Sequence, residues 1–515
     1  MKIALLPLDE RPANTRYPMQ IAAMAGASIL LPPPKLLSSL RQPANRAGLA
    51  KWLTDIAPSA DGIVASIDLL GHGGLIASRI GDNSVQDVLQ AVAPLMQLRK
   101  PGLPTGLPVF AFNVIQRISN ADDNTEEPLF WGEYGAALYR YSRALDLALS
   151  GDADAQQDCH TLESHIPEEH RQAWLARRLR NHTVNLAMLH AATQGAFDLL
   201  VIPSDDTSPI GLSARERKHL EAMRSLTQVP GTGDQIASAW HLSQVLMYPG
   251  ADDLGSALVA RMVNQLCQHA PKVFVHYTDE RMLRNIAPYE DRPIFMAVET
   301  QIMAVGAQPA TSIDEADVVL VVSPPFERVN GQDPHPRNLD SQHRIDMLLP
   351  EVLRIRNWVR AGHKVAIADV AFPNGAEPAL VELLFEHVEV AKLISFGGWN
   401  TAGNTLGTVL GAACVPHQND AARQTQLAHH LLEDWGYQSV VRNELRASPL
   451  ATQTDGWGAG GVVAEFTAQQ LAPIAARIRA AGLPCQPTQV RHPWGRTFEM
   501  DFELRGHDHI ALDAI

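Results

Sequence analysis

The sequence has few of the residues that build disulfide frameworks or zinc sites. Four cysteines occur among 515 residues, and no two of them are spaced as a CxxC pair. We therefore expect neither a disulfide framework nor a structural zinc site, and this cysteine usage fits a reducing cytoplasm. One lysine and a short apolar run precede Asp9 and Glu10, which is typical of a first strand rather than of a signal peptide.

Long uncharged apolar runs and an excess of positive charge are also missing. The apolar stretch GIVASIDLLGHGGLIAS contains Asp68 and His72, so we expect no membrane-spanning segment. The formal net charge is −14, whereas a nucleic-acid binder needs a basic face. We therefore expect neither a membrane nor a nucleic acid as a partner. The oligomeric state stays open, with a homodimer as one option.

The motifs of common cofactor and nucleophile sites are absent. The turn after the first strand reads LPLDERP instead of GxGxxG, and no GxxxxGK[ST], GxSxG or HExxH motif occurs. We therefore expect no cofactor and no tightly bound transition metal. Any chemistry must come from carboxylates, amides and arginines.

Nine short apolar runs bounded by turn residues are typical of strands that are buried on both faces. These runs are KIALLPL, SILLPP, GIVASIDLL, PVFAFNVI, DLLVIPS, KVFVHYT, DVVLVVSPP, KVAIADVA and KLISFGG. Helix-length segments separate most of them. The sequence therefore predicts an α/β fold with parallel sheets.

The first strand and its charged end occur twice. KIALLPLDER begins at Lys2, and KVFVHYTDER begins at Lys272. In both places a proline lies eight residues before a glutamine that opens an apolar segment ending in Gly-Ala, at Gln20 and at Gln301. This repeat predicts two related parallel-sheet units of the Rossmann or flavodoxin type. The alternatives are coincidence and a single (β/α)8-like barrel, because nine strands are nearly enough for one.

The predicted organisation has three parts. A first α/β unit covers residues 1–250, a second covers residues 251–420, and a small α+β region covers residues 421–515. A helical hairpin is predicted as an insert at 126–195, where mixed charge follows a helical period. The last part reads as a helix, the segment VVAEFT, another helix and RTFEMDFEL.

Polar residues follow the ends of many predicted strands. The carboxyl ends of parallel strands meet at one edge of a sheet, where α/β proteins build their sites. The predicted catalytic residues are Asp205, Asp206, Asp9 and Asp68. The predicted substrate-binding residues are Glu10, Arg11, His72, Asn113, Asp369, Trp399, Asn400 and Asn404. For any one of them, helix capping is the simpler alternative, and it is preferred for one of Asp252 and Asp253.

These residue types favour carbohydrate chemistry. Trp399 offers a flat face for a sugar ring, and amides such as Asn400 and Asn404 hydrogen-bond hydroxyl groups, although a buried Trp with Asn caps gives the same pattern. Two carboxylates without a cofactor suit glycoside hydrolysis, in which one acid protonates the leaving oxygen and the other attacks or activates water. Oxygen ligands could instead hold Mg²⁺ or Mn²⁺ in a metal-dependent hydrolase. A protein that binds or senses a small carbohydrate is the third reading.

Several longer motifs are shared with one bacterial family. They are LPLDERPANTRYP, DLLGHGGLIASR, PSDDTSPIGLSARE, YPGADDLGSALVAR, ADVAFPNGAEPAL and GGWNTAGNTLGTVL. Over roughly residues 1–415 the chain resembles the family catalogued as domain of unknown function 4127. The resemblance implies no defined activity, only an association with bacterial sugar uptake and cell-wall sugar metabolism.

Overall fold

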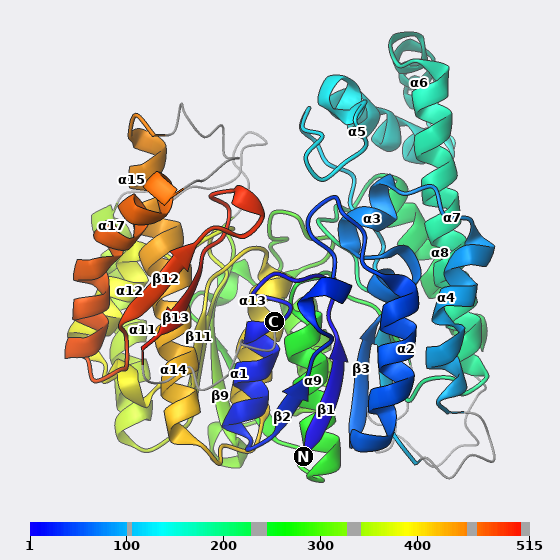
Figure 1. The fold of residues 1–515 in the computed structure, drawn as a ribbon. Helices are drawn as coiled ribbons and strands as arrows, with labels where there is room; N and C mark the ends of the chain where they lie inside the picture. The colour runs from blue at the N-terminus through cyan, green and yellow to red at the C-terminus, as the bar shows by residue number, and fades with distance from the viewer. Residues whose placement is uncertain (100–105, 228–244, 327–340, 451–460, 506–515) are drawn as a thin grey trace.

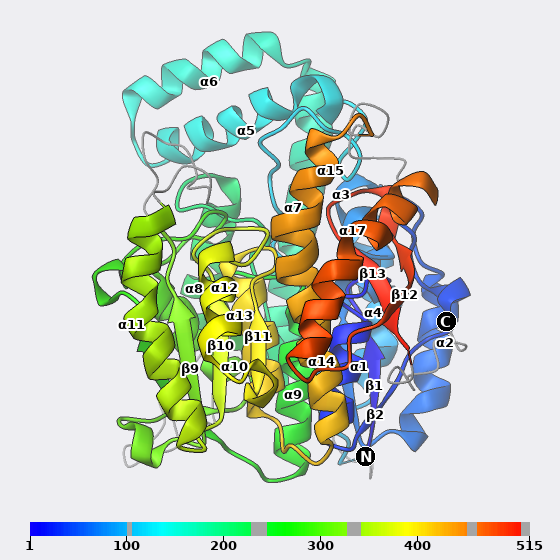
Figure 2. The same ribbon diagram turned by 90° about the vertical axis from the view of Figure 1, so that its left-hand side faces the viewer.

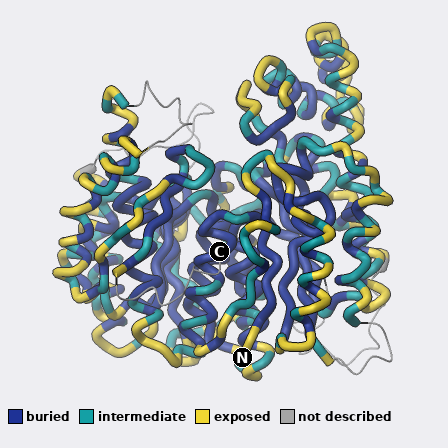
Figure 3. The backbone as a smooth tube through the Cα atoms, in the orientation of Figure 1, coloured by how far each residue is buried: buried dark blue, intermediate teal, exposed yellow. Residues whose placement is uncertain are grey.

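The computed structural model of the chain describes residues 1–99, 106–227, 245–326, 341–450 and 461–505. They form a six-stranded sheet, a five-stranded sheet and a two-stranded hairpin, with helices around them (Figure 1). The strands of both large sheets run through the buried interior (Figure 3). The α/β prediction is confirmed. The barrel alternative is wrong, because both large sheets of the described residues are open and end in edge strands.

The first sheet is parallel and has the strand order β2-β1-β3-β4-β5-β6. Its strands are β1 (Lys2–Leu6), β2 (Ser28–Leu30), β3 (Gly62–Ser66), β4 (Val109–Phe112), β5 (Leu199–Val201) and β6 (Val245–Leu246). The second sheet is also parallel and has the order β11-β10-β9-β7-β8. Its strands are β7 (Lys272–Tyr277), β8 (Gln308–Pro309), β9 (Val318–Ser323), β10 (Val365–Asp369) and β11 (Ser395–Gly397).

The two sheets share one topology. If each is numbered from its first strand, both contain the order 2-1-3-4-5, which is the flavodoxin-like arrangement, and the first sheet adds a sixth strand beside the fifth. β1 lies between β2 and β3 as β7 lies between β8 and β9, so the predicted repeat is confirmed. The strand starts match in detail. The Lys2 amide donates to Asp61 at 2.7 Å, and the Lys272 amide donates to Asp317 at 2.8 Å.

A layer of helices between the sheets joins the two units. It consists of α1 (Arg16–Met24), α9 (Leu254–Leu266), α10 (Ile294–Ala304) and α13 (Ala402–Cys414). A continuous apolar cluster runs from Ile3 and Leu5 of β1, through these helices, to Leu320 of β9. The helices α9 and α13 pack on each other, each next to its own sheet. The units therefore share a core, and their carboxyl edges are held at a fixed distance.

The outer face of each sheet has its own cover. On the first sheet, Ala4 and Leu6 point away from the shared core, as alternation along a strand requires, and pack against the outer helices. Those helices are α2 (Arg46–Ile56), α4 (Val85–Gln97), α7 (Glu168–Thr193) and α8 (Leu212–Thr227). The second sheet is covered by α11 (Ser341–Arg360), α12 (Pro378–His387), α14 (Asp420–His430) and the π-helical η9 (Leu431–Val441).

Three helices follow one another between β4 and β5, where the sequence predicts a hairpin. They are α5 (Trp131–Ala148), α6 (Ala153–His165) and α7. A small apolar cluster that includes Trp131, Leu138, Tyr141 and Trp174 stabilises this group. Figure 2 shows α5 and α6 above the sheets, so they form a wall beyond the carboxyl edge of the first sheet.

The C-terminal region departs from the prediction in two places. VVAEFT and the helix expected after it form one helix, α17 (Gly461–Ala480), in which Val463, Thr467 and Leu471 are buried at helical spacing. RTFEMDFEL gives β13 (Asp501–Leu504), which pairs antiparallel with the unpredicted β12 (Pro487–Arg491).

β6 and β8 of the two large sheets were also not predicted, because strands of two residues show no alternation of apolar and polar residues. The short α15 (Arg442–Ala447) and α3 (Leu75–Ile80) complete the helices used below.

Candidate functional site

A polar cavity of about 880 Å³ lies where the carboxyl edges of the two sheets meet. Loops after β1, β5 and β6 line it from the first unit, and loops after β7, β10 and β11 line it from the second. Residues of α5 form one outer wall, and residues of α15 with the loop before β13 form the opposite one (Figure 1). This volume lies within the roughly 300–1,000 Å³ of small-molecule sites.

Strained backbone gathers around this cavity. Asp206, Tyr289, Asn374 and Asn400 line it, and all four have positive φ, at 35°, 66°, 60° and 67°. Two backbone hydrogen bonds hold these loops together, from Thr207 to the Tyr289 carbonyl and from Asn374 to the Asn400 carbonyl, both 2.9 Å. Such strain costs on the order of 1–3 kcal/mol for each residue and collects at ligand sites. It marks the cavity as the candidate functional site.

Arg11 organises one side of the cavity. Its guanidinium donates to both oxygens of Asp9 and to both oxygens of Asp252, at 2.5 and 3.1 Å for the latter. Asp252 also accepts hydrogen bonds of 3.1 Å from Asn14 and from Asn400. Asp252 therefore stands in the cavity as a carboxylate whose charge is matched by a buried arginine and two amides.

A second network lies after β5. Arg79 donates to Asp205 at 2.5 Å and to Glu126 at 3.1 Å, and Arg117 donates to Asp206 at 3.2 Å. Arg117 and Arg496 also pair with Glu126. Burial raises the pKa of Glu126, but the charges of Arg117, Arg496 and Arg79 outweigh burial and lower it.

Asp205 has a different electrostatic setting from Glu126. Burial and the neighbouring charge of Asp206 raise the pKa of Asp205 to about 7, against the opposing charges of Arg79 and Arg117. Asp205 therefore holds a proton in a sizeable fraction of molecules near neutral pH. Asp205 and Asp252 line the same cavity, and each is bound by a different arginine, Arg79 and Arg11.

Four of the twelve predicted site residues line the cavity: Arg11, Asp205, Asp206 and Asn400. Asp9 lies behind Arg11 and is only 2% exposed, so the structure places it as the partner of that arginine rather than on the cavity wall. Glu10 accepts hydrogen bonds from Ser38 at 2.9 Å and from Trp494 at 2.5 Å. It ties the end of β1 to the C-terminal region instead of facing a ligand.

Asp68 and His72, which follow β3, do not line the cavity, although Arg79 and the loop after β4 do. Asp68 is buried and accepts from the Val114 amide at 2.9 Å and from Gln116 at 3.0 Å, and burial raises its pKa to about 7. It braces the loop whose Gln116 accepts from Arg79. His72 is buried in the π-helical turn η3 (Asp68–His72), and burial lowers its pKa to about 3.

Asn113 and the remaining residues of the second unit are likewise internal. Asn113 donates to Asn185 of α7. Burial and Glu377 raise the pKa of Asp369 to about 7, and Asp369 accepts from the Glu377 amide at 2.5 Å. Asn404 accepts from the amides of Ala251 and Asp252, both at 3.0 Å, and so positions the loop that carries Asp252.

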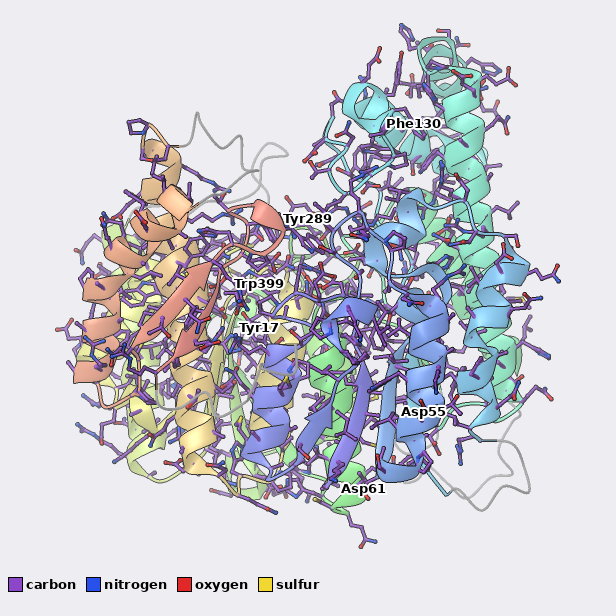
Figure 4. The ribbon with its side chains drawn as sticks, in the orientation of Figure 1. Tyr17, Asp55, Asp61, Phe130, Tyr289 and Trp399 are labelled. Atoms are coloured by element: carbon purple, nitrogen blue, oxygen red, sulfur yellow. The ribbon has the colours of Figure 1, made fainter. Side chains whose placement is uncertain are left out.

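Trp399 does not offer its face to a ligand. It is 5% exposed, and its ring packs edge-on against Tyr17 and Phe498 at centroid distances of 6.4 and 6.0 Å. Figure 4 shows Trp399 with Tyr17 inside the molecule, below Tyr289. Asp9, Asp68, Asn113 and Trp399 therefore do not line the cavity with Arg11, Asp205 and Asn400. Tyr139, Tyr289 and Phe498 are the aromatic residues that line it.

Several lining residues were not predicted from the sequence. Asp252 was set aside as a possible helix cap, although its side chain caps nothing and bonds Arg11. Other unpredicted lining residues are Arg79, Arg117, Glu126, Arg143, Arg442, Arg446 and Arg496. Arg79 ends the shared motif DLLGHGGLIASR, which is the signal that could have found it.

Two further features bear on the class of protein. Across the described ranges, no group of three or more His, Cys, Asp or Glu side chains is arranged to hold a metal ion. The helices of those ranges are also too short or too polar to span a bilayer.

The fold and the cavity define a two-unit α/β protein whose polar pocket is built by the carboxyl edges of both sheets. The chain belongs to the family described as Protein of unknown function (DUF4127), and the match covers residues 3–503. The match extends well beyond residue 415, so the C-terminal wall of the cavity lies within the family domain. No curated protein and no solved structure matches the chain.

Proposed function

We propose that the protein is a hydrolase that cleaves the glycosidic bond of a small sugar conjugate. The observation that supports this proposal is the pairing of Asp205 and Asp252 in one strained, polar cavity. Asp205, with its pKa raised to about 7, donates a proton to the leaving oxygen. Asp252, held by Arg11, Asn14 and Asn400, attacks the sugar or activates water.

The cavity supplies the other requirements of sugar binding. Asn374 and Asn400 are held in fixed left-handed conformations and line the cavity, where their amides are available to sugar hydroxyls. Tyr289 and Phe498 contribute aromatic surface, the role first expected of Trp399. Burial, together with the neighbouring charge of Asp206, raises the pKa of Asp205 toward the range that a general acid needs.

The test compares two kinds of substrate. Asp252→Asn should reduce turnover of aryl glycosides and of cell-wall sugar fragments about equally, by roughly 10³-fold or more. Asp205→Asn should reduce turnover of the sugar fragments far more than that of aryl glycosides, because a good leaving group needs little protonation. Asp279→Asn serves as a control, because Asp279 lies in the second DER segment and does not line the cavity, and it should leave turnover unchanged.

The pH profile gives an independent check. As the acid must be protonated, kcat/KM should fall as the pH rises through about 7, and Asp205→Asn should lose this limb. A wild-type protein that is inactive on the whole panel would contradict the proposal. Metal-stimulated release of phosphate or acetate would then indicate a metal-dependent hydrolase, and tight sugar binding without turnover would indicate a binding protein.

A further inference from the structure

A stacked series of arginine and aromatic side chains runs along the C-terminal wall of the cavity. Arg11 lies over the Trp494 ring at 4.5 Å, and Arg496 lies over the same ring at 4.5 Å. Arg496 then lies 4.8 Å from the Phe498 ring, and Arg442 lies 5.0 Å from it. We call these five residues the arginine–aromatic ladder. All three of its arginines line the cavity.

The charges along the ladder are not balanced evenly. Arg11 is paired with Asp9 and Asp252, and Arg496 is paired with Glu126 and Glu499. Arg442 has no carboxylate partner within the described part of the chain. Its one hydrogen bond to a side chain goes to Gln438 at 2.8 Å.

Arg442 is nevertheless buried. It is 6% exposed, and its Nε has no hydrogen-bond partner among the described residues. Burial, with the nearby charge of Arg446, lowers the pKa of Arg442 to about 10. A desolvated cation without an anion is costly, and the usual remedy is a paired oxyanion. The cavity is the open side from which such a group can approach.

Two further arginines face the same space. Arg446 lies one turn after Arg442 on α15, and Arg143 lies on α5 at the opposite wall. Neither has a carboxylate partner in the described ranges, and Arg143 lies 6.0 Å from the Tyr139 ring. Seven arginines and five carboxylates thus line the cavity. The unbalanced positive charge is concentrated in the three arginines of the outer walls.

We propose that Arg442, with Arg446 and Arg143, binds an oxyanion carried by the substrate, so that the protein acts on an acidic sugar conjugate rather than a neutral one. The oxyanion is a phosphate or a carboxylate, which share the donor geometry that guanidinium recognises. The inference rests on the proposed function in one respect, namely that the molecule carrying the oxyanion is a sugar. The anion site itself follows from the side chains.

The test is a binding measurement that needs no turnover. Titration calorimetry with glucose, glucose 6-phosphate, glucuronate and inorganic phosphate would give the affinity of each probe. We expect glucose 6-phosphate or glucuronate to bind at least tenfold tighter than glucose, and the preferred one identifies the oxyanion. Arg442→Gln should remove this preference, and Arg446→Gln and Arg143→Gln should each weaken it several-fold.

Arg140→Gln is the matched control, because Arg140 lies on α5, is exposed and does not line the cavity. It should leave the preference unchanged. If Arg442→Gln impairs folding, the two outer variants still decide the question. The proposal is overturned if the wild type binds no anion more tightly than glucose, or if all three variants keep the preference.

The same experiment separates this inference from the proposed function. Preferential binding of an acidic sugar without any hydrolysis supports the anion site and removes the glycosidase. Hydrolysis of neutral glycosides by a wild type that binds no acidic probe more tightly than glucose supports the glycosidase and removes the anion site.

Discussion

The two DER segments have the same local structure and different surroundings. Asp9 accepts from the Arg11 amide, Nε and Nη2 at 3.0, 3.0 and 2.7 Å, and Asp279 accepts from the same atoms of Arg281 at 3.0, 2.9 and 2.7 Å. Arg11 is only 4% exposed, whereas Arg281 is 78% exposed. The repeated sequence therefore specifies the Asp–Arg pair, but not whether that pair becomes part of a site.

The difference comes from residues far along the chain. Asp252, Trp494 and Glu499 surround Arg11, and they are more than 200 residues away from it. Arg281 has Asp279 as its ion-pair partner. A small pocket of about 320 Å³ lies at the second segment, but it lacks the network of buried charges. The main cavity thus lies at the copy of the repeat that the C-terminal region encloses.

The largest expected effect comes from replacing the arginine of each DER segment. Arg11→Met leaves Asp9, Asp252 and Glu499 buried without their counter-charge, so we expect the free energy of unfolding to fall by about 3–5 kcal/mol. Arg281→Met should change it by less than about 0.5 kcal/mol, because an exposed ion pair contributes little. Denaturation midpoints in urea would measure both. Equal losses would mean that the surroundings of Arg11 do not stabilise the fold.

A second contrast concerns pH. The helices α9 and α13, which pack on each other, carry the similar sequences DLGSAL and TLGTVL, in which Asp253 and Thr405 hold the same position. Burial raises the pKa of Asp253 to about 7, which its hydrogen bond from Gln301 opposes. Below about pH 4 both folded and unfolded Asp253 are protonated. Between about pH 4 and 7 the folded state keeps the proton that the unfolded state loses, so stability falls with rising pH.

Asp253→Asn should remove this loss, which for one group is up to ~1.4 kcal/mol for each pH unit. The variant should gain stability relative to the wild type at pH 8 and not at pH 4, measured by urea midpoints across that range. Thr405→Val is the control, because it removes a hydrogen bond of 2.8 Å to the Trp399 carbonyl and no titratable group. A difference between Asp253→Asn and the wild type that does not vary with pH would contradict the assignment.

The same two helices allow a packing test. A Cβ on Gly407 of α13 would overlap the carboxylate of Asp253, whereas a Cβ on Gly255 of α9 would lie 2.9 Å from the flexible ring of Pro18. Gly407→Ala should therefore lower the free energy of unfolding by about 1–3 kcal/mol. Gly255→Ala should cost less than about 1 kcal/mol, since a change of ring pucker relieves the contact. The reverse order would show that the helices do not pack as described.

The parts of the fold set by local sequence could be predicted. The strands β1 and β7, their Asp–Arg pairs and the shared strand order follow from a repeat that can be read directly. Arg11, Asp205, Asp206 and Asn400 line the cavity because the strand ends of parallel sheets converge, which the sequence pattern allows one to anticipate. VVAEFT was separated from the helix that follows it because six residues are too few to show a helical period.

The parts set by distant contacts could not be predicted. Whether Asp252 caps a helix or bonds Arg11 depends on a residue 241 positions earlier. Trp399 lies in a loop beside amide side chains, as a sugar-binding residue would. However, Tyr17 and Phe498 from distant parts of the chain pack against its ring. Arg442 and Arg496 reach the cavity only because η9 and the C-terminal hairpin pack beside the second sheet. No local pattern marks them.

The smallest expected effect concerns a position at which the two units have the same local structure. Asp61 lies at the start of β3, beside the amino end of β1 (Figure 4), and Asp317 holds the equivalent position before β9. Each exposed carboxylate accepts one backbone hydrogen bond, so Asp61→Ala and Asp317→Ala should each lower the free energy of unfolding by about 1 kcal/mol. Asp55→Ala is the control, because it breaks only an exposed pair with Lys51. Because both positions have the same partner atoms and similar exposure, their two losses should agree within about 0.5 kcal/mol in urea denaturation. A clearly larger loss for one of them would show that the repeat has diverged even at its strand starts, away from the cavity.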